Sequence, residues 1–477
     1  MGRYKRKKRL RLRVLLHNAQ KTFRNRVKRQ KLKVYKRALK WEQYRLNRVY
    51  RQQAKTIRSF KDTMDLFLPI NIRYLLNCEQ SPFYGPKIKK YGKNKSGVIR
   101  VPKEFSIITN PHDSYQTIAK VLACFFYQCC TTVRLDYVNC EKIDLVTMVF
   151  LDAILKDIDT YMDKCKRAEV LRYSRLSGMG GCNYYNDEIN KMINSVGSPA
   201  IITKRRFNFE GVIPFRLLCF DSHAASADKK LQQKEIDTTN VLEYINKCLN
   251  RFHKTLSKDA MMNLGYVVGE TLINAEEHSS TGFRYMIGYM EDKKSKKSEH
   301  SGVFNFVIMN FGQTIYEKFK MSDNTDVNQE CLIQMKNLSD RFVKRSLFMK
   351  RFKEETLWTL YTLQQGVTCV PEKKRGNGTI QFIESFFKLK GNDDVDDISR
   401  MYILSGNTII EFDGTYRLSE SKDENGVSRG IISFNKSGSL DERPDSKYVK
   451  YVDDYFPGTA IFVRLLLNEN DIITEQK

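Results

Sequence analysis

The first 60 residues carry a charge that a packed core cannot accommodate. They hold 23 of the 82 Lys and Arg residues but only one of the 55 acids, Glu42. The other 417 residues carry 59 Lys and Arg against 54 Asp and Glu. The sequence therefore predicts a nearly neutral folded body with a strongly basic arm, residues 1–60, and a polyanion is the expected partner of that arm.

The arm has no Pro, and its only Gly is Gly2. Apolar residues scattered among its bases predict a helix up to about Phe60, and a tail that orders only on binding is the alternative. Aromatic residues alternate with the bases: Tyr4, Phe23, Tyr35, Trp41, Tyr44 and Tyr50. Such rings can stack on unpaired bases, which favours RNA or single strands as the nucleic acid. Packing of the rings against the body and binding of the arm to an anionic membrane are the alternatives.

Length and composition limit the remaining classes. With 477 residues and 41% hydrophobic residues, the chain can form two to four domains. It has no apolar run of 18 residues and no apolar signal core, so we expect a cytoplasmic protein without a membrane span. Its 11 cysteines form no CxxC pair, so we expect reduced, mostly buried thiols and neither a zinc site nor a disulfide framework.

After a connector at residues 61–97, rich in Pro and Gly, a first α/β domain is expected at residues 98–220. The pattern predicts three strands at 98–101, 105–108 and 132–136, and two helices at 115–129 and 143–162. This order resembles a STAS domain, the fold of anti-sigma-factor antagonists, through Leu135-Asp136 and Ile143-Asp144-Leu145. The phosphoacceptor Ser of that family falls on Leu145, so the resemblance implies that its phosphorylation switch is missing. Gly178 to Gly181 lack the Lys-Ser/Thr of a phosphate loop, and we expect a flexible loop.

A second domain, combining helices and strands, is expected at residues 236–470. The pattern predicts helices at 241–256, 259–277 and across 327–363. It predicts strands at 283–290, 303–309, 401–404, 408–412 and 459–466. A charged loop, residues 291–302, is expected between the first two strands, and a hairpin turn is expected at Gly406-Asn407.

Two polar residues share one flank of the predicted helix 259–277. Its apolar positions form one buried face: Leu264, Val267, Val268, Thr271, Leu272 and Ala275. Glu270 and Asn274 lie four residues apart, so they point to neighbouring positions beside that face. A carboxylate and an amide oxygen together suit Mg²⁺ and a positioned water, although an exposed polar pair of this kind is also common.

Four further sequence motifs make the nucleotide interpretation specific. The stretch from Gly269 to His278 closely resembles the Asn box of the GHKL superfamily, the Bergerat-fold ATPases. Asn310-Phe311-Gly312-Gln313-Thr314 falls where that family has DxGxG, and Gly376-Asn377-Gly378 matches its later glycine motif. Gly458-Thr459 opens the last strand as the family's Gly-Thr does. Four motifs in this order imply a GHKL-like α/β sandwich that binds ATP.

The resemblance assigns roles residue by residue. It implies that Asn274 is the Mg²⁺ ligand and that Glu270 is the general base or water-positioning group. Gly312 belongs to the nucleotide-binding box, and Gly376 and Gly378 would let the backbone approach the phosphates. Asn310 and Thr459 would reach the adenine. His278 could contact phosphate or the lid, or be a structural histidine at the helix end. The bases could neutralise phosphate or be solvated charges of the lid: Lys373, Lys374 and Arg375. Asn310 replaces the family's Asp, so the bond to adenine should be weaker, and Thr314 replaces a Gly and could crowd the pocket.

Three functions stay open at this stage. The first is an Mg²⁺-dependent ATPase switch that acts with nucleic acid through the arm, with a role in bacterial stress or antiviral defence suggested by the domain pairing. The second is a protein serine/threonine kinase, and the third is a nucleotide-sensing interaction module that does not hydrolyse ATP. Autophosphorylation on histidine is disfavoured because His253 is followed by Lys254 and not by an acid. Glu270 and the arm favour the first function; a protein partner and the oligomeric state stay open.

Overall fold

The fold was analysed on a computed structural model of the chain. It describes residues 33, 36–37, 40–41, 44–45, 48–49, 51, 60–91, 97–128, 132–169, 178–203, 205, 207–277, 279–295, 298–321, 329–343, 352–364, 367, 378–390, 395–422 and 428–468. The chain divides into two compact units, residues 1–68 with 160–175, and residues 69–159 with 176–477. No helix in the described part of the chain is long and apolar enough to cross a membrane.

The first unit contains the basic arm. Its described residues between 33 and 51 are helical and exposed, and they include the bases Lys33, Lys36, Arg37, Lys40, Arg45, Arg48 and Arg51. Helix α2 (Phe60–Phe67) and the end of α6 (Leu145–Arg167) complete the unit. Arg51 pairs with Glu169 there. Residues 1–32, which make up half of the predicted arm, lie outside the described residues.

The second unit begins with an α/β region around short parallel strands. Strands β1 (Val98–Arg100), β3 (Thr132–Asp136) and β5 (Gly178–Cys182) form one sheet, and β2 (Glu104–Phe105) pairs with β4 (Lys142–Ile143). The helices of this region are α3 (Ile70–Asn77), α4 (Gly85–Lys89), α5 (Pro111–Ala123), α6, α7 (Asp187–Val196) and α8 (Ser198–Ile202). A π-helical turn, Cys124–Gln128, extends α5. The alternation of strands and helices predicted for residues 98–162 is confirmed, but of the strand predicted at 105–108 only Phe105 belongs to β2. The connector predicted without regular structure at 61–97 contains α3, α4 and most of α2.

The prediction of a flexible loop at Gly178 to Gly181 is wrong. These residues form β5, which pairs in parallel with β3 from Thr132 to Asp136. Glycine is required for packing at Gly181, because a Cβ there would lie 1.9 Å from the hydroxyl of Tyr184. The rings of Tyr184 and Tyr137 lie 5.0 Å apart and are tilted by 33°. Gly181 therefore leaves room for the Tyr184 ring, whereas a Cβ on Gly178 or Gly180 would meet nothing within 4 Å, and the run forms a strand and not a loop.

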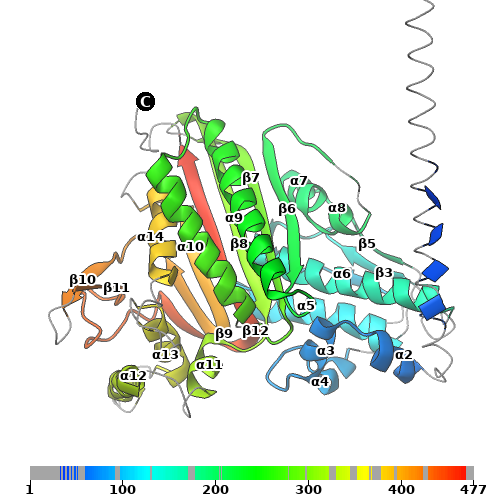
Figure 1. The fold of residues 1–477 in the computed structure, drawn as a ribbon, viewed down its shortest axis with the longest axis horizontal. Coiled ribbons are helices and arrows are strands. Elements are labelled where there is room, and N and C mark those ends of the chain that lie inside the picture. Colours follow the sequence, from blue (N-terminus) through cyan, green and yellow to red (C-terminus); the bar gives the residue numbers. More distant parts are fainter. Residues whose placement is uncertain are drawn as a thin grey trace, which may run out of the picture. The chain divides into compact units, whose positions relative to one another are not determined.

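A five-stranded sheet organises the rest of the second unit (Figure 1). Its strands, in spatial order, are β6 (Val212–Asp221), β7 (Phe283–Ser295), β8 (Ser298–Phe311), β12 (Val449–Asn468) and β9 (Arg400–Phe412). All neighbouring strands are antiparallel. Strand β6 lies almost entirely within residues 98–220, the first predicted domain, but pairs with β7 of the second, and residues of both belong to this one compact unit. Residues 291–302, predicted as a charged loop, largely extend β7 and β8.

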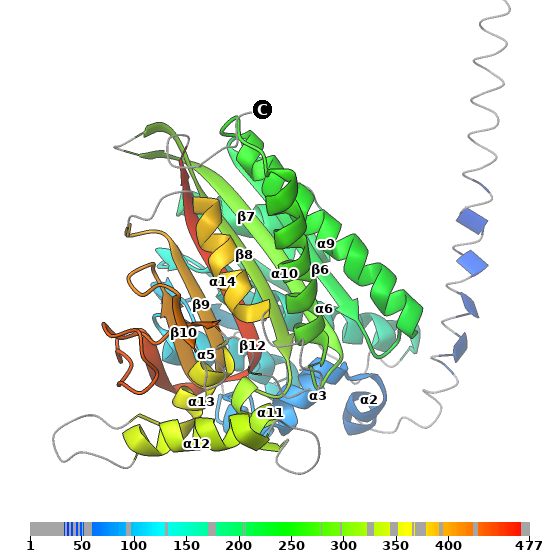
Figure 2. The ribbon, with the colours of Figure 1, turned by 60° about the vertical axis from the view of Figure 1, so that its left-hand side comes forward.

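Each face of the five-stranded sheet is covered by helices. Helices α9 (Ala227–Asn250), α10 (Lys258–Glu277) and α14 (Gly378–Lys390) pack on one face (Figures 1 and 2). Phe150 of α6 contacts Phe311 and Phe456 from the opposite side, with ring centroids 5.2 and 5.5 Å apart. Helices α11 (Ile315–Met321), α12 (Gln329–Val343) and α13 (Glu354–Thr362) and the hairpin β10 (Ser419–Lys422) with β11 (Ser428–Ile431) complete the unit. The class is therefore mixed α/β.

The predicted hairpin turn at Gly406-Asn407 is absent from β9, which runs unbroken through both residues. Gly406 has a φ of +58°, and the pairing with β12 shifts between Tyr451 and Phe456. The half-buried carboxylate of Glu355 accepts a hydrogen bond from the Asn407 backbone N–H at 2.7 Å. The glycine therefore forms an irregularity at which the strand bends and continues.

Candidate functional site

Helix α10 carries the two residues that sequence analysis assigned to catalysis and metal binding. The structure confirms the predicted buried face, because Leu264, Val267, Val268, Thr271 and Leu272 are all buried. Glu270 and Asn274 are only partly buried. Among the described residues, neither side chain has a hydrogen bond or ion pair, so their oxygens are available to a ligand.

Three elements meet at one edge of the sheet. They are the end of α10, the end of β8, and the part of β12 that begins at Gly458 and pairs with β8. Asn310, at the end of β8, donates from Nδ2 to the carbonyl oxygen of Ala275 in α10 at 2.9 Å. Its Oδ1 accepts from the backbone N–H of Thr459 at 3.1 Å. The hydroxyl of Thr459 lies 3.1 Å from that of Ser405 in β9. The structure thus brings together Asn310, Thr459 and the end of α10.

These contacts explain why residue 310 is Asn. It is 1% exposed, and each end of its amide already has a partner. An Asp carboxylate at this position would place an acceptor oxygen against the carbonyl oxygen of Ala275, and two acceptors cannot form a hydrogen bond. The amide therefore ties α10 to β12, and a bond to adenine would have to compete with this structural role.

The two glycines at this edge allow close approach of the backbone. Gly458 has a φ of +150°, and a Cβ on it would lie 2.1 Å from the carbonyl oxygen of Asn310. Gly312 has the same φ, and its carbonyl oxygen accepts a hydrogen bond from Tyr74 of α3 at 2.7 Å. Both glycines are thus required by the junction itself.

Thr314 has a structural role that sequence analysis missed. Its hydroxyl accepts from the backbone N–H of Glu317 at 3.1 Å, and the Glu317 carboxylate accepts from the backbone N–H of Thr314 at 2.9 Å. This reciprocal pair is a capping box that starts α11. The Thr-x-x-Glu spacing was readable in the sequence and gives Thr314 a structural reason to be Thr.

Helix α14 lies beside α10 on the same face of the sheet (Figure 2). Strand β9 runs from Arg400, which pairs with Arg464, to Ser405, which pairs with Thr459. Helix α14 precedes β9 in the chain, so its last residue lies toward the Arg400 end of the sheet. Its first residue therefore lies toward the Thr459 end, where α10 also ends. Gly378, the first residue of α14, therefore belongs to the same end of the sheet as Asn274. His278, Lys373 to Arg375 and Gly376 lie outside the described residues.

A buried ion-pair network next to the motif was not predicted. Arg284 of β7 is 1% exposed, and it pairs with Asp237 of α9 at 2.7 Å and with Glu276 of α10 at 2.8 Å. Its guanidinium also lies over the ring of Phe220, 4.8 Å from the centroid. Burial lowers the pKa of Arg284, whereas burial raises the pKa of Glu276 against the pull of Arg284. No local pattern relates residues 237, 276 and 284, so only the fold reveals that Glu276 is structural.

Within the described part of the chain, no cluster of three or more His, Cys, Asp and Glu residues could hold a metal ion. A cation at Asn274 would therefore depend on additional oxygens from its ligand. Mg²⁺ commonly binds in this way, through one or two protein oxygens, waters and the phosphates of a substrate. The donor set at Glu270 and Asn274 fits such a shared site and does not fit a site made by protein alone.

Comparisons with known proteins add no relative. No protein-family model matches the sequence, no curated protein matches it, and no solved structure matches the fold.

Proposed function

We propose that the chain is an Mg²⁺-dependent ATPase switch of the GHKL type that acts with nucleic acid through its basic arm. One observation supports the ATP-binding part of the proposal. Glu270 and Asn274 are partly exposed, and neither side chain has a hydrogen-bond or ion-pair partner among the described residues. Both lie on α10, which ends where β8, β12 and α14 converge. Residues that serve only the core would be buried or paired at such a junction.

The chemistry assigned to each group is simple. The side-chain oxygen of Asn274 would hold the cation, and Glu270 would orient a water and accept its proton. The first N–H groups of α14, which begins at Gly378, would bind phosphate oxygens because they have no partner within the helix. When bound, Mg²⁺ would neutralise part of the phosphate charge. Since the Asn310 amide is already used, other groups would have to recognise the base.

Calorimetry of ATP and ADP binding to the full chain, with and without Mg²⁺, tests the proposal. Asn274→Ala should abolish Mg²⁺-dependent binding, whereas Glu270→Ala should keep ATP bound and reduce turnover at least a hundredfold. Asn263→Ala, on an exposed turn of the same helix, is the matched control and should change neither. Undiminished binding by the Asn274 variant would refute the assignment, and a wild type without turnover would favour the nucleotide-sensing module.

The kinase alternative has its own test. Incubation with γ-labelled ATP and mass spectrometry should detect no phosphate between residues 136 and 150, because Leu145 occupies the STAS-like serine position and is buried at the start of α6. A stoichiometric phosphate in that interval would favour the kinase.

Exposed bases and rings on the arm support the nucleic-acid part of the proposal. Trp41 and Tyr44 are 73% and 63% exposed, so these rings are available for stacking. Replacing Lys36, Arg37 and Lys40 together by Gln should lower the slope of log affinity against log salt by about 2 to 3, since each phosphate contact contributes about 0.7 to 0.9. Trp41→Ala should weaken binding to single strands more than to duplexes. Preference of the wild type for anionic vesicles over both nucleic acids would contradict this part.

A further inference from the structure

A cavity of about 300 Å³ lies on the face of the five-stranded sheet opposite α9, α10 and α14. Strand alternation establishes the face: Phe304 and Phe306 pack in the core with those helices, and Asn305 between them lines the cavity. The other wall comes from β4, the start of α6 and α7. The cavity shares no residue with the edge formed by Asn310, Thr459 and the end of α10, so a ligand site in it is independent of the proposed function.

Most charged side chains at this cavity are neutralised by neighbours. Four ion pairs account for them: Lys142 with Glu104 at 2.7 Å, Glu141 with Lys103 at 3.2 Å, Lys293 with Glu188 at 3.1 Å, and Glu291 with Lys191 at 3.3 Å. Two lining residues of opposite charge have no such pair within the described part of the chain, Arg464 and Asp144.

Arg464 lies on β12, and its buried Nε has no hydrogen-bond acceptor. Its guanidinium makes no hydrogen bond or ion pair with any described residue. A half-buried guanidinium without an acceptor is costly, because the lost hydration is not replaced.

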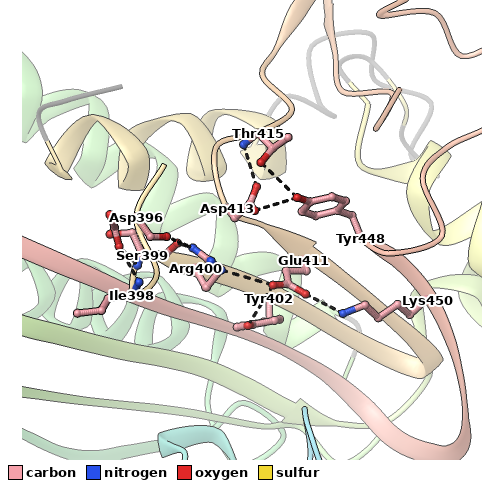
Figure 3. Close-up of polar contacts among 10 residues, drawn as sticks. All are labelled: Asp396, Ile398, Ser399, Arg400, Tyr402, Glu411, Asp413, Thr415, Tyr448 and Lys450. Atoms are coloured by element: carbon pink, nitrogen blue, oxygen red, sulfur yellow. Dashed lines mark hydrogen bonds and ion pairs between the residues drawn. The ribbon is translucent and has the colours of Figure 1, made fainter. Parts of the chain in front are cut away.

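The neighbouring strand shows what a satisfied arginine looks like at the same level of the sheet (Figure 3). Arg400 pairs with Arg464 in the register of β9 and β12. It donates to the carbonyl oxygen of Ser399 at 2.7 Å and pairs with Glu411 at 3.5 Å, and Glu411 in turn accepts from Lys450 at 2.7 Å. Arg464 has no equivalent of Glu411.

Asp144 stands at the start of α6 on the other wall. One carboxylate oxygen, Oδ1, accepts from the backbone N–H of Thr147 at 2.6 Å and so caps the helix. The second oxygen, Oδ2, is buried and has no hydrogen-bond partner. Burial raises the pKa of Asp144, although the nearby Ser106 and Thr147 oppose the shift. One carboxylate oxygen is therefore committed to the fold, and the other is buried in the cavity wall without a hydrogen-bond partner among the described residues.

The remaining lining is mostly apolar and includes Ile189, Met192 and Phe462, while the polar Asn305 and Tyr289 donate hydrogen bonds to the Tyr289 carbonyl and to Glu291. We propose that the cavity binds a small zwitterion of the amino-acid class, with its carboxylate on Arg464, its ammonium group near Asp144 and its side chain against Ile189, Met192 and Phe462. Arginine binds carboxylates through two parallel hydrogen bonds, and a cavity of this volume is at the small end of metabolite sites.

The test uses the full chain and the free amino acids leucine and phenylalanine, with 4-methylpentanoate as the analogue of leucine that lacks the amino group. At least one amino acid should raise the melting temperature and bind by calorimetry. Arg464→Gln should weaken that binding at least tenfold. Arg400→Gln, whose side chain lies on the next strand and already has an acceptor, is the control and should leave binding unchanged.

Asp144→Asn keeps the test decisive if the Arg464 variant folds poorly. Asn caps helices as well as Asp does, so α6 should be preserved while the charge is lost. This variant should weaken leucine binding about tenfold and leave 4-methylpentanoate unaffected, which a merely structural role would not do. Absence of any amino-acid binding to the wild type, equal binding of leucine and 4-methylpentanoate, or binding that is insensitive to both substitutions would overturn the proposal.

Discussion

The two sides of the five-stranded sheet treat buried charge differently. On the side of α9 and α10, Arg284 forms ion pairs with both Asp237 and Glu276. On the side of α6, Asp144 and Asp152 each keep a buried carboxylate oxygen without a hydrogen-bond partner, and Arg464 keeps its Nε without one. The difference lies in ion pairing: Arg284 has two opposite charges beside it, although its Nε and Nη1 also lack a hydrogen-bond acceptor among the described residues, whereas Asp144, Asp152 and Arg464 have no ion pair there. The difference indicates where the molecule is built for stability and where it can respond to its surroundings.

Removing the compensating charge should have the largest effect on stability. Arg284→Met leaves Asp237 and Glu276 buried near each other without a cation, and we expect the free energy of unfolding to fall by about 3 to 5 kcal/mol. Chemical denaturation at pH 7 measures it.

The matched control for that variant is Arg251→Ala. Arg251 pairs with Asp292 at 2.5 Å, but its side chain is 52% exposed, so the loss should stay within about 1 kcal/mol. Equal losses in the two variants would contradict the contrast between buried and exposed pairs.

Neutralising a buried charge on the opposite side of the sheet should raise the free energy of unfolding instead of lowering it. Burial raises the pKa of Asp152 to about 7, although hydrogen bonds from Ser198 oppose the shift. The folded protein therefore holds a proton that the unfolded chain loses above about pH 4, so the stability falls as the pH rises from about 4 to about 7. Asp152→Asn removes this loss and should stabilise the protein at pH 8 by up to about 4 kcal/mol, at about 1.4 kcal/mol per pKa unit.

Urea denaturation at pH 5 and pH 8 checks the prediction for Asp152. The stabilisation by Asn should be much smaller at pH 5 than at pH 8. Asp259→Asn, at an exposed position in the first turn of α10, should show no such difference between the two pH values. A gain by Asp152→Asn that is independent of pH would show that the carboxyl group is not responsible.

A third substitution places an uncompensated charge on the side of α9 and α10 and should have the smallest effect. Asn310→Asp turns a donor toward the Ala275 carbonyl into an acceptor, and we expect a loss of about 1 to 3 kcal/mol. The GHKL resemblance predicts the opposite for function, because Asp is the family's adenine-binding residue. Thermal unfolding and ATP calorimetry on the same variant separate the two: tighter ATP binding without loss of stability would favour the adenine role over the structural one.

Much of the local structure was predictable because it depends on periodicity within one segment. Strand β3 has the predicted bounds, and α10 starts one residue before the predicted helix and ends with it. Thr314 could also have been recognised as a helix cap from the Thr-x-x-Glu spacing alone. Glycine was the least reliable guide: it predicted a loop where β5 forms and a hairpin turn where β9 continues. What a glycine does depends on whether a ring such as Tyr184 or a carboxylate such as Glu355 lies against it, and the sequence does not show that.

The sequence by itself determined the separation of a basic arm from a nearly neutral body, the mixed α/β class, and the placement of Glu270 and Asn274 on one flank of an amphipathic helix. These depend on composition and on periods of two and 3.6 residues, which neighbouring residues set. Only the tertiary structure decided that the Asn310 amide is used by Ala275 and Thr459, and that Asp144 and Arg464 face one cavity. The physical reason is that burial and pairing are properties of residues brought together from distant segments, and the free energy of a polar group depends on which partner arrives there.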